Sequence, residues 1–147
     1  MDGVLFPDEI VIKTEYFTVA QDWEVPIEGF FIISSNRKLR SVAEFSDEES
    51  LEFVRLLRRV RKEMEEALSI KEVYLFQNEN TEHGFHLWMF PRLEWMEQYG
   101  RKIQSVRPIM EHAKKEMATE EVIHNVKDAA ARVRERMKDF SFGVVPP

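Results

Sequence analysis

The stretch Gly84-Phe85-His86-Leu87-Trp88-Met89-Phe90-Pro91-Arg92 has the composition of a buried strand that carries one histidine at its middle. Alternate side chains of a strand share a face, so His86 and Trp88 should point to the same side as Gly84. The side chains between them should point into the core. We therefore expect a slot over Gly84, walled by Trp88, where a ligand can approach the imidazole.

A polar loop, residues 77–83, precedes this strand. A titratable imidazole on a rigid strand beside a polar loop is typical of a nucleophile or a general base. The alternative interpretation is a partly buried histidine whose ring nitrogen is satisfied by a backbone carbonyl. From the residues alone, both interpretations of His86 stay open.

Further segments with strand composition are residues 10–14, 16–20, 30–34 and 71–77. Only the region of Glu15 separates the first two segments, which predicts a tight turn between two strands. The segment 30–34 is apolar on both faces and should be a central strand. The segment 71–77 and the His86 strand flank one loop, so we expect them to pair antiparallel.

A change to helical periodicity follows Ser46. Ser46 and Glu49 have the spacing of a capping box, and apolar side chains recur at helical spacing from Phe53 to Leu68. These features predict a helix over residues 47–68. Its opposite face is cationic, which we interpret as a solvated face.

From Trp95 onward the sequence is again helical. One helix should follow Pro108, and another should run from the N-cap residue Thr119 to about residue 138. The chain thus combines strand segments in its first two thirds with a long helix and further C-terminal helices. Residues 1–147 should form a single domain, in which residues 97–147 are a helical extension.

The composition excludes several classes of function. The chain has 147 residues, 44% hydrophobic and 33% charged, which predicts one globular domain. The net charge of −6 argues against nucleic-acid binding, and the absence of cysteine removes disulfides and thiolate zinc sites. The start at Met1 lacks the features of a signal peptide, and no apolar run is long enough to span a membrane. We therefore expect a soluble cytoplasmic protein without a membrane partner.

His83 and His86 form a His-x-x-His pair, but on one extended strand their side chains would face opposite sides. No third histidine is near in the sequence, so we predict neither a metal site nor a cofactor. The chain also lacks a glycine-rich phosphate loop and a Gly-x-Ser-x-Gly elbow.

The run from His86 to Arg92 resembles the signature of the histidine triad family of nucleotide hydrolases and transferases. That signature is His-φ-His-φ-His-φ-φ, often followed by Pro-Arg in the dinucleoside polyphosphate hydrolase branch. When the two are aligned on Pro91-Arg92, the middle histidine falls on His86, whereas Gly84 and Trp88 stand at the outer positions. The triad is therefore degenerate, with only its middle histidine kept. The resemblance covers residues 10–96.

This resemblance implies an α+β fold, with an antiparallel sheet of about five strands, one long helix and extra C-terminal helices. It also implies a homodimer and a covalent mechanism. In the family, the middle histidine attacks the α-phosphate of a nucleotide and forms a nucleotidyl-histidine intermediate, which assigns the role of nucleophile to His86. The other candidate contacts to the nucleotide are Gln77, Trp88, His83, Gln21 near the ribose, and Arg92. Thr81 and the basic stretch 36–40 are candidates to replace the hydrogen bonds and charge of the missing imidazoles.

Three functions remain open at this point. The first is a hydrolase or nucleotidyl transferase acting on a diadenosine tetraphosphate-like or nucleoside phosphoramidate substrate. The second is a nucleotide-binding protein with weak or no catalytic activity. The third is an interaction protein in which His86 is a core residue.

Overall fold

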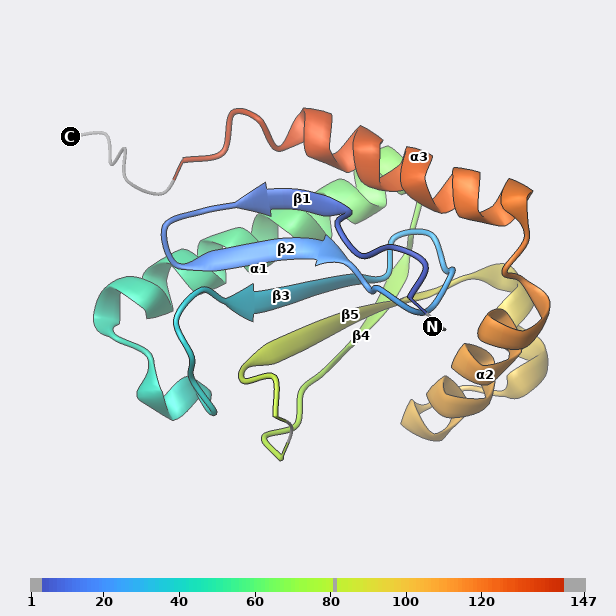
Figure 1. Cartoon of the computed structure of the whole chain (residues 1–147), viewed down its shortest axis with the longest axis horizontal. Coiled ribbons are helices and arrows are strands. Elements are labelled where there is room, and N and C mark those ends of the chain that lie inside the picture. Colours follow the sequence, from blue (N-terminus) through green and yellow to red (C-terminus); the bar gives the residue numbers. More distant parts are fainter. Residues whose placement is uncertain (1–3, 81, 142–147) are drawn as a thin grey trace.

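The computed structural model of the chain describes residues 4–80 and 82–141 (Figure 1). Its strands are β1 (Ile10–Lys13), β2 (Phe17–Gln21), β3 (Phe31–Ser35), β4 (Glu72–Phe76) and β5 (His86–Arg92). Its helices are α1 (Asp47–Leu68), α2 (Val106–Glu116) and α3 (Glu120–Arg136). Short 3-10 turns are η1 (Val42–Glu44), η2 (Glu94–Tyr99) and η3 (Ile103–Ser105). The predicted α+β fold is confirmed.

The five strands form one antiparallel sheet in the order β1-β2-β3-β5-β4. β3 lies at its centre, as the doubly apolar segment 30–34 predicted. β5 pairs with β4 through Trp88 opposite Phe76, and with β3 through His86 opposite Ser34. The predicted antiparallel pair around the polar loop is therefore confirmed, and His86 enters the sheet at the first position of β5.

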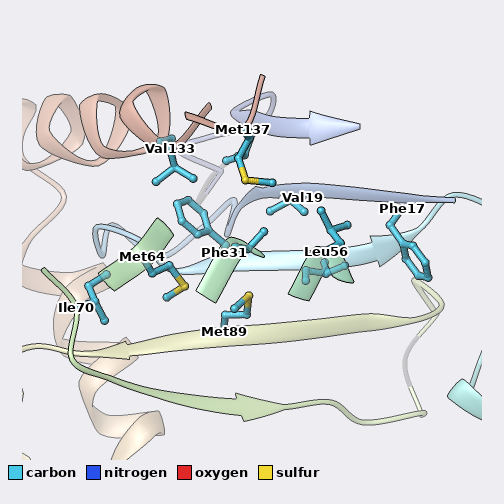
Figure 2. Packing of buried hydrophobic residues seen from close by; sticks show 13 residues of the cluster. Phe17, Val19, Phe31, Leu56, Met64, Ile70, Met89, Val133 and Met137 are labelled. Atoms are coloured by element: carbon cyan, nitrogen blue, oxygen red, sulfur yellow. The ribbon is translucent and has the colours of Figure 1, made fainter. Parts of the chain in front are cut away.

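One face of the sheet packs against α1 and α3. Figure 2 shows side chains from β2, β3 and β5 meeting Leu56 and Met64 of α1 and Val133 of α3 in a single buried cluster. Met89 of β5 belongs to this cluster and is fully buried. The alternation predicted for the His86 strand is confirmed on this side, because odd-numbered side chains of β5 face the core.

The opposite face is covered over only part of its area. A second buried cluster joins Phe30 and Phe90 of the sheet to η2, to α2 and to the loop that follows β2. Trp88 is only partly buried at the margin of this cluster, and His86 lies beyond it. The C-terminal segments therefore divide, with α2 on the face that carries His86 and α3 on the other face (Figure 1).

Helix ends follow the predicted caps, with one difference. Ser46 and Glu49 form the capping box of α1, and the Thr119 side chain accepts a hydrogen bond from Val122 N at the start of α3. α2 begins at Val106 rather than after Pro108. Pro108 thus lies inside the first turn, where a missing N–H breaks no intrahelical hydrogen bond.

Glu49 should stabilise the fold only when it is ionised. Its carboxylate, almost fully buried, accepts hydrogen bonds from the Arg37 guanidinium at 2.7 and 2.9 Å and from Ser46 N. The Arg37 hydrogen bond lowers the pKa of Glu49 against the opposing effect of burial. A lowered folded-state pKa gives stability that is present above the unfolded pKa and is lost as the pH falls through the folded value.

We therefore expect Glu49→Gln to lower the free energy of unfolding by about 1–2 kcal/mol at pH 7, with the deficit closing below about pH 4. Urea unfolding of both proteins across this pH range measures the difference. Glu48→Gln is the matched control, since Glu48 is an exposed carboxylate of the same first turn. If the difference in the free energy of unfolding between Glu49→Gln and wild type does not change with pH, the ionised Glu49 carboxylate is not the stabilising group.

Candidate functional site

The imidazole of His86 is held in one orientation by a backbone carbonyl. Its Nδ1 lies 3.0 Å from the carbonyl oxygen of Gly84. Because a carbonyl oxygen can only accept, Nδ1 carries the proton and Nε2 keeps a free lone pair. Partial burial lowers the pKa of His86 below its usual value, helped by nearby His83 and opposed by the Gly84 hydrogen bond. The ring is therefore neutral at pH 7, with Nε2 available as a nucleophile or base.

Aromatic rings surround His86 on several sides. Trp23 and His83 each lie edge-on to it, with ring centroids 6.0 and 5.9 Å away, and these two rings are 5.9 Å from each other. The Trp88 ring stacks beside His86 at 5.9 Å, and Phe76 continues the row at 5.6 Å from Trp88. The predicted wall at Trp88 is thus present, and Trp23 adds a second wall.

The indole N–H of Trp88 is already engaged. It donates to Oδ2 of Asp22 at 3.3 Å, while Oδ1 of Asp22 accepts from the backbone N–H groups of Glu24 and Val25 at 2.9 Å. Burial raises the pKa of Asp22, and these hydrogen bonds oppose that shift. Asp22 thus ties the loop after β2 to β5 and fixes the Trp88 ring beside His86.

Position 84 has no room for a side chain. Gly84 has φ +83°, a left-handed conformation that disfavours residues with a Cβ, and a Cβ built there would lie 3.1 Å from the carbonyl oxygen of Leu39. The same Cβ would lie 3.8 Å from Cγ of Lys38. The backbone of the loop after β3 therefore lies against residue 84, and the expectation of a ligand slot over Gly84 is wrong on this side.

The three cations of that loop are used differently. Arg37 pairs with Glu49 of α1, and Arg40 pairs with Glu79 of the polar loop at 2.8 Å. Lys38 is exposed, and within the part of the chain that the structure describes it forms no ion pair. Lys38 is therefore the loop cation that is available to a ligand.

Two of the predicted ligand contacts have other partners in this structure. Gln21 is buried, and its amide donates to the carbonyl oxygen of Ile27 at 2.9 Å. Arg92 is also buried and donates to Ser105 Oγ and the Gly100 carbonyl at the far end of β5, about 20 Å from His86 at 3.3 Å per residue. Both side chains donate hydrogen bonds to the backbone of loops, so a direct contact with a ligand at His86 would require them to move.

Gln77 lies at the rim of the aromatic row. Its side chain donates to Asn78 O, and with Phe76 it lines a groove of about 410 Å³ whose other wall is the start of α2. His83 is exposed beside His86. Thr81 lies outside the described residues. Of the predicted contacts, the structure therefore brings His83 and Trp88 to His86 and leaves Gln77 beyond Phe76.

Asp22 and Trp23 are site residues that sequence reasoning missed. In the sequence they are an Asp-Trp pair in a loop directly after a strand, which carries no functional signal by itself. Their importance depends on the return of the loop to β5, where Trp23 meets His86 and Asp22 meets Trp88.

Solved structures with the same architecture are histidine triad proteins. A hypothetical histidine triad nucleotide-binding protein from Sulfolobus tokodaii strain7 aligns with a TM-score of 0.62 and 14% identity, over 92% of this chain and 91% of that chain. The chain has the histidine triad fold. A Hit-like protein involved in cell-cycle regulation from Bartonella henselae aligns with a TM-score of 0.59 and 13% identity, over 88% and 86%. A zinc-bound histidine triad family protein from Mycobacterium smegmatis aligns with a TM-score of 0.58 and 15% identity, over 88% of this chain and 88% of that chain.

At these identities, the likeness establishes the histidine triad fold and not the activity. No protein-family model and no curated protein matches the sequence. Among residues 4–80 and 82–141, no group of three or more His, Asp or Glu side chains is placed to hold a metal ion. None of the described helices is long and apolar enough to cross a membrane.

Proposed function

We propose that this histidine triad-fold protein is a nucleotide hydrolase or nucleotidyl transferase, with His86 as its nucleophile. The observation that carries the proposal is the Nδ1–H···O=C hydrogen bond to Gly84, which leaves Nε2 unprotonated. The lowered pKa of His86 keeps that nitrogen free at neutral pH. Both properties are what covalent attack by an imidazole requires.

The reaction would proceed in two steps. Nε2 attacks the α-phosphorus, the new P–N bond forms, and the bond to the leaving group breaks with its electron pair going to that group. Water or another acceptor then attacks the same phosphorus, the P–N bond breaks, and the neutral imidazole is restored once the attacking water loses a proton. The substrate would be a diadenosine tetraphosphate-like molecule or a nucleoside phosphoramidate.

A second candidate is nucleotide binding without turnover. The observation that favours it is the engagement of the Trp88 N–H by Asp22, which leaves neither outer position with a free donor for phosphate oxygens. Charge developing on a transferring phosphoryl group needs such donors. His83 and the basic stretch 36–40 would then serve binding alone.

Trapping of the intermediate separates the two candidates. The protein is mixed with α-32P-labelled diadenosine tetraphosphate or adenosine phosphoramidate and denatured in base, in which a phosphorus–nitrogen bond on histidine survives. Label on the wild-type protein but not on His86→Ala supports the first candidate. Thermal stabilisation by AMP without label or turnover supports the second.

We also propose that the protein is a homodimer that pairs through β4. The edge at β1 is covered by α3, whose Arg134 donates to Ile10 O. β4 is the other edge, and the exposed side chains Leu75 of β4 and Val54 of α1 line an apolar groove of about 320 Å³ beside it. An open apolar edge strand is a ready surface for pairing with a second chain.

Leu75→Lys should convert this dimer to a monomer, because the substitution places a charge in the contact. Light scattering coupled to size-exclusion chromatography measures the change in mass. Val42→Lys is the control, since Val42 is comparably exposed (53% against 50%) but lies in η1, away from β4. A wild-type monomer at micromolar concentration, or a dimer that survives Leu75→Lys, would contradict pairing at this edge.

For location, the cysteine-free composition suits a reducing compartment. We propose the cytoplasm.

A further inference from the structure

Two side chains that can bind an anion lie on two sides of Gly84, the imidazole of His83 and the ammonium of Lys38. His83 precedes it in the chain and places its ring 5.9 Å from the ring of His86. Lys38 arrives from the loop after β3, with Cγ 3.8 Å from the position of a Cβ at residue 84. Lys38 is exposed and its side chain is flexible beyond Cγ, so its ammonium can move along the surface beside Gly84.

In the part of the chain that the structure describes, the arginines on either side of Lys38 form ion pairs and Lys38 does not. Arg37 and Arg40 are paired with Glu49 and Glu79, and the Arg40–Glu79 pair joins the basic loop to the polar loop. This exposed pair links the two loops that carry Lys38 and His83. Among the described residues no carboxylate forms an ion pair with the Lys38 ammonium, which is therefore available to a ligand.

We propose that Lys38 and His83 form an anion subsite beside His86, which binds the phosphate that leaves when His86 attacks. The inference rests on the proposed function and narrows its substrate class. A site with a cation at the leaving group favours a phosphoric anhydride, such as a nucleoside or dinucleoside polyphosphate, over a phosphoramidate.

The leaving groups of the two substrate classes are stabilised in different ways. Cleavage of an anhydride breaks a P–O bond, and the electron pair ends on a phosphate oxygen whose new negative charge a nearby ammonium stabilises. Cleavage of a phosphoramidate breaks a P–N bond to an amine, which needs a proton rather than a cation. Lys38 should therefore accelerate the first reaction much more than the second.

The test compares Lys38→Met, Lys38→Arg and Lys62→Met with wild type on diadenosine tetraphosphate and adenosine phosphoramidate. Lys62 is an exposed lysine of α1, on the opposite side of the sheet, and controls for the loss of one surface charge. We expect Lys38→Met to lower kcat/KM about 100-fold on the anhydride and less than about 3-fold on the phosphoramidate. Lys38→Arg should restore most of the loss, and Lys62→Met should change neither substrate.

If Lys38→Met lowers kcat/KM equally on the two substrates, or on neither, the subsite is wrong. The assignment of His86 as nucleophile is not affected by either result. If His86→Ala turns over nucleotides as well as wild type does, the proposed function fails instead. The subsite is then decided by binding alone, through thermal stabilisation by AMP and ADP. The subsite is supported if ADP raises the melting temperature of the wild type more than AMP does and if this difference disappears in Lys38→Met. Equal increases in melting temperature for ADP and AMP in the wild type reject it.

Discussion

Replacing His86 by alanine should reduce kcat/KM for nucleotide turnover by at least about 1,000-fold, because the covalent route loses the atom that attacks phosphorus. The fold should survive. His86 is only partly buried, and among the described residues its ring makes one hydrogen bond, to the Gly84 carbonyl. Single-turnover measurements with the labelled substrate report the loss directly, and thermal melting confirms that the variant is folded.

His86→Asn is the closest control in shape. Its amide can still donate to the Gly84 carbonyl, yet it has no nucleophilic nitrogen, so it should be as inactive as alanine. His83→Ala should still form the labelled intermediate, although more slowly, because His83 contacts the leaving phosphate in the proposed subsite but is not the attacking group. Full activity in either His86 variant would show that the nucleophile is assigned to the wrong residue.

The pH profile gives an independent check on the same group. Only the neutral imidazole can attack, and burial lowers the pKa of His86. The kcat/KM of the wild type should therefore fall to half of its plateau value at a pH below about 6.5, the ordinary pKa of histidine. A half-maximal kcat/KM at or above about pH 6.5 would contradict a lowered pKa.

Gly84→His, which restores the first imidazole of the triad signature, should lower activity about 100-fold rather than raise it. The left-handed backbone at residue 84 disfavours any side chain, and the new Cβ would press on the Leu39 carbonyl at 3.1 Å. Relief of that contact requires residue 84 to move, and its carbonyl is the group that orients His86. Misplacing a catalytic group by about 1 Å can cost a factor of 100.

Gly84→Ala separates the backbone effect from the imidazole. It should lose nearly as much activity as Gly84→His, and both should be destabilised by about 1–3 kcal/mol in urea unfolding. Activity of Gly84→His above wild type would show that the loop yields and that the outer imidazole can function here.

Local features of the sequence predicted the elements well. The Ser46 and Glu49 capping box predicted the start of α1, and the alternation along residues 84–92 predicted which side chains of β5 face the core. These predictions succeeded because caps and periodicity depend on residues a few positions apart. The start of α2 was less certain, because a proline is tolerated at several positions of a first turn.

The candidate site could be predicted only in part. His86 was found because it stands alone on an apolar strand and because its surroundings resemble a known signature. Trp23 and Asp22 were missed, because their roles depend on how the loop after β2 returns to the sheet. Arg92 and Gln21 were candidate contacts by residue type, but burial gives each of them a backbone carbonyl as partner.

By itself, the sequence determined the α+β class, the order of the strands along the chain and the face of β5 that carries His86. The tertiary structure alone decided that the loop after β3 lies against Gly84, that Lys38 is the loop cation without an ion pair among the described residues, and that Asp22 holds Trp88. The physical reason is the separation in sequence between the residues that interact. Periodicity and caps are local, whereas the steric contact between residues 84 and 39 and the hydrogen bond from Trp88 to Asp22 join residues that are more than 40 positions apart in the chain.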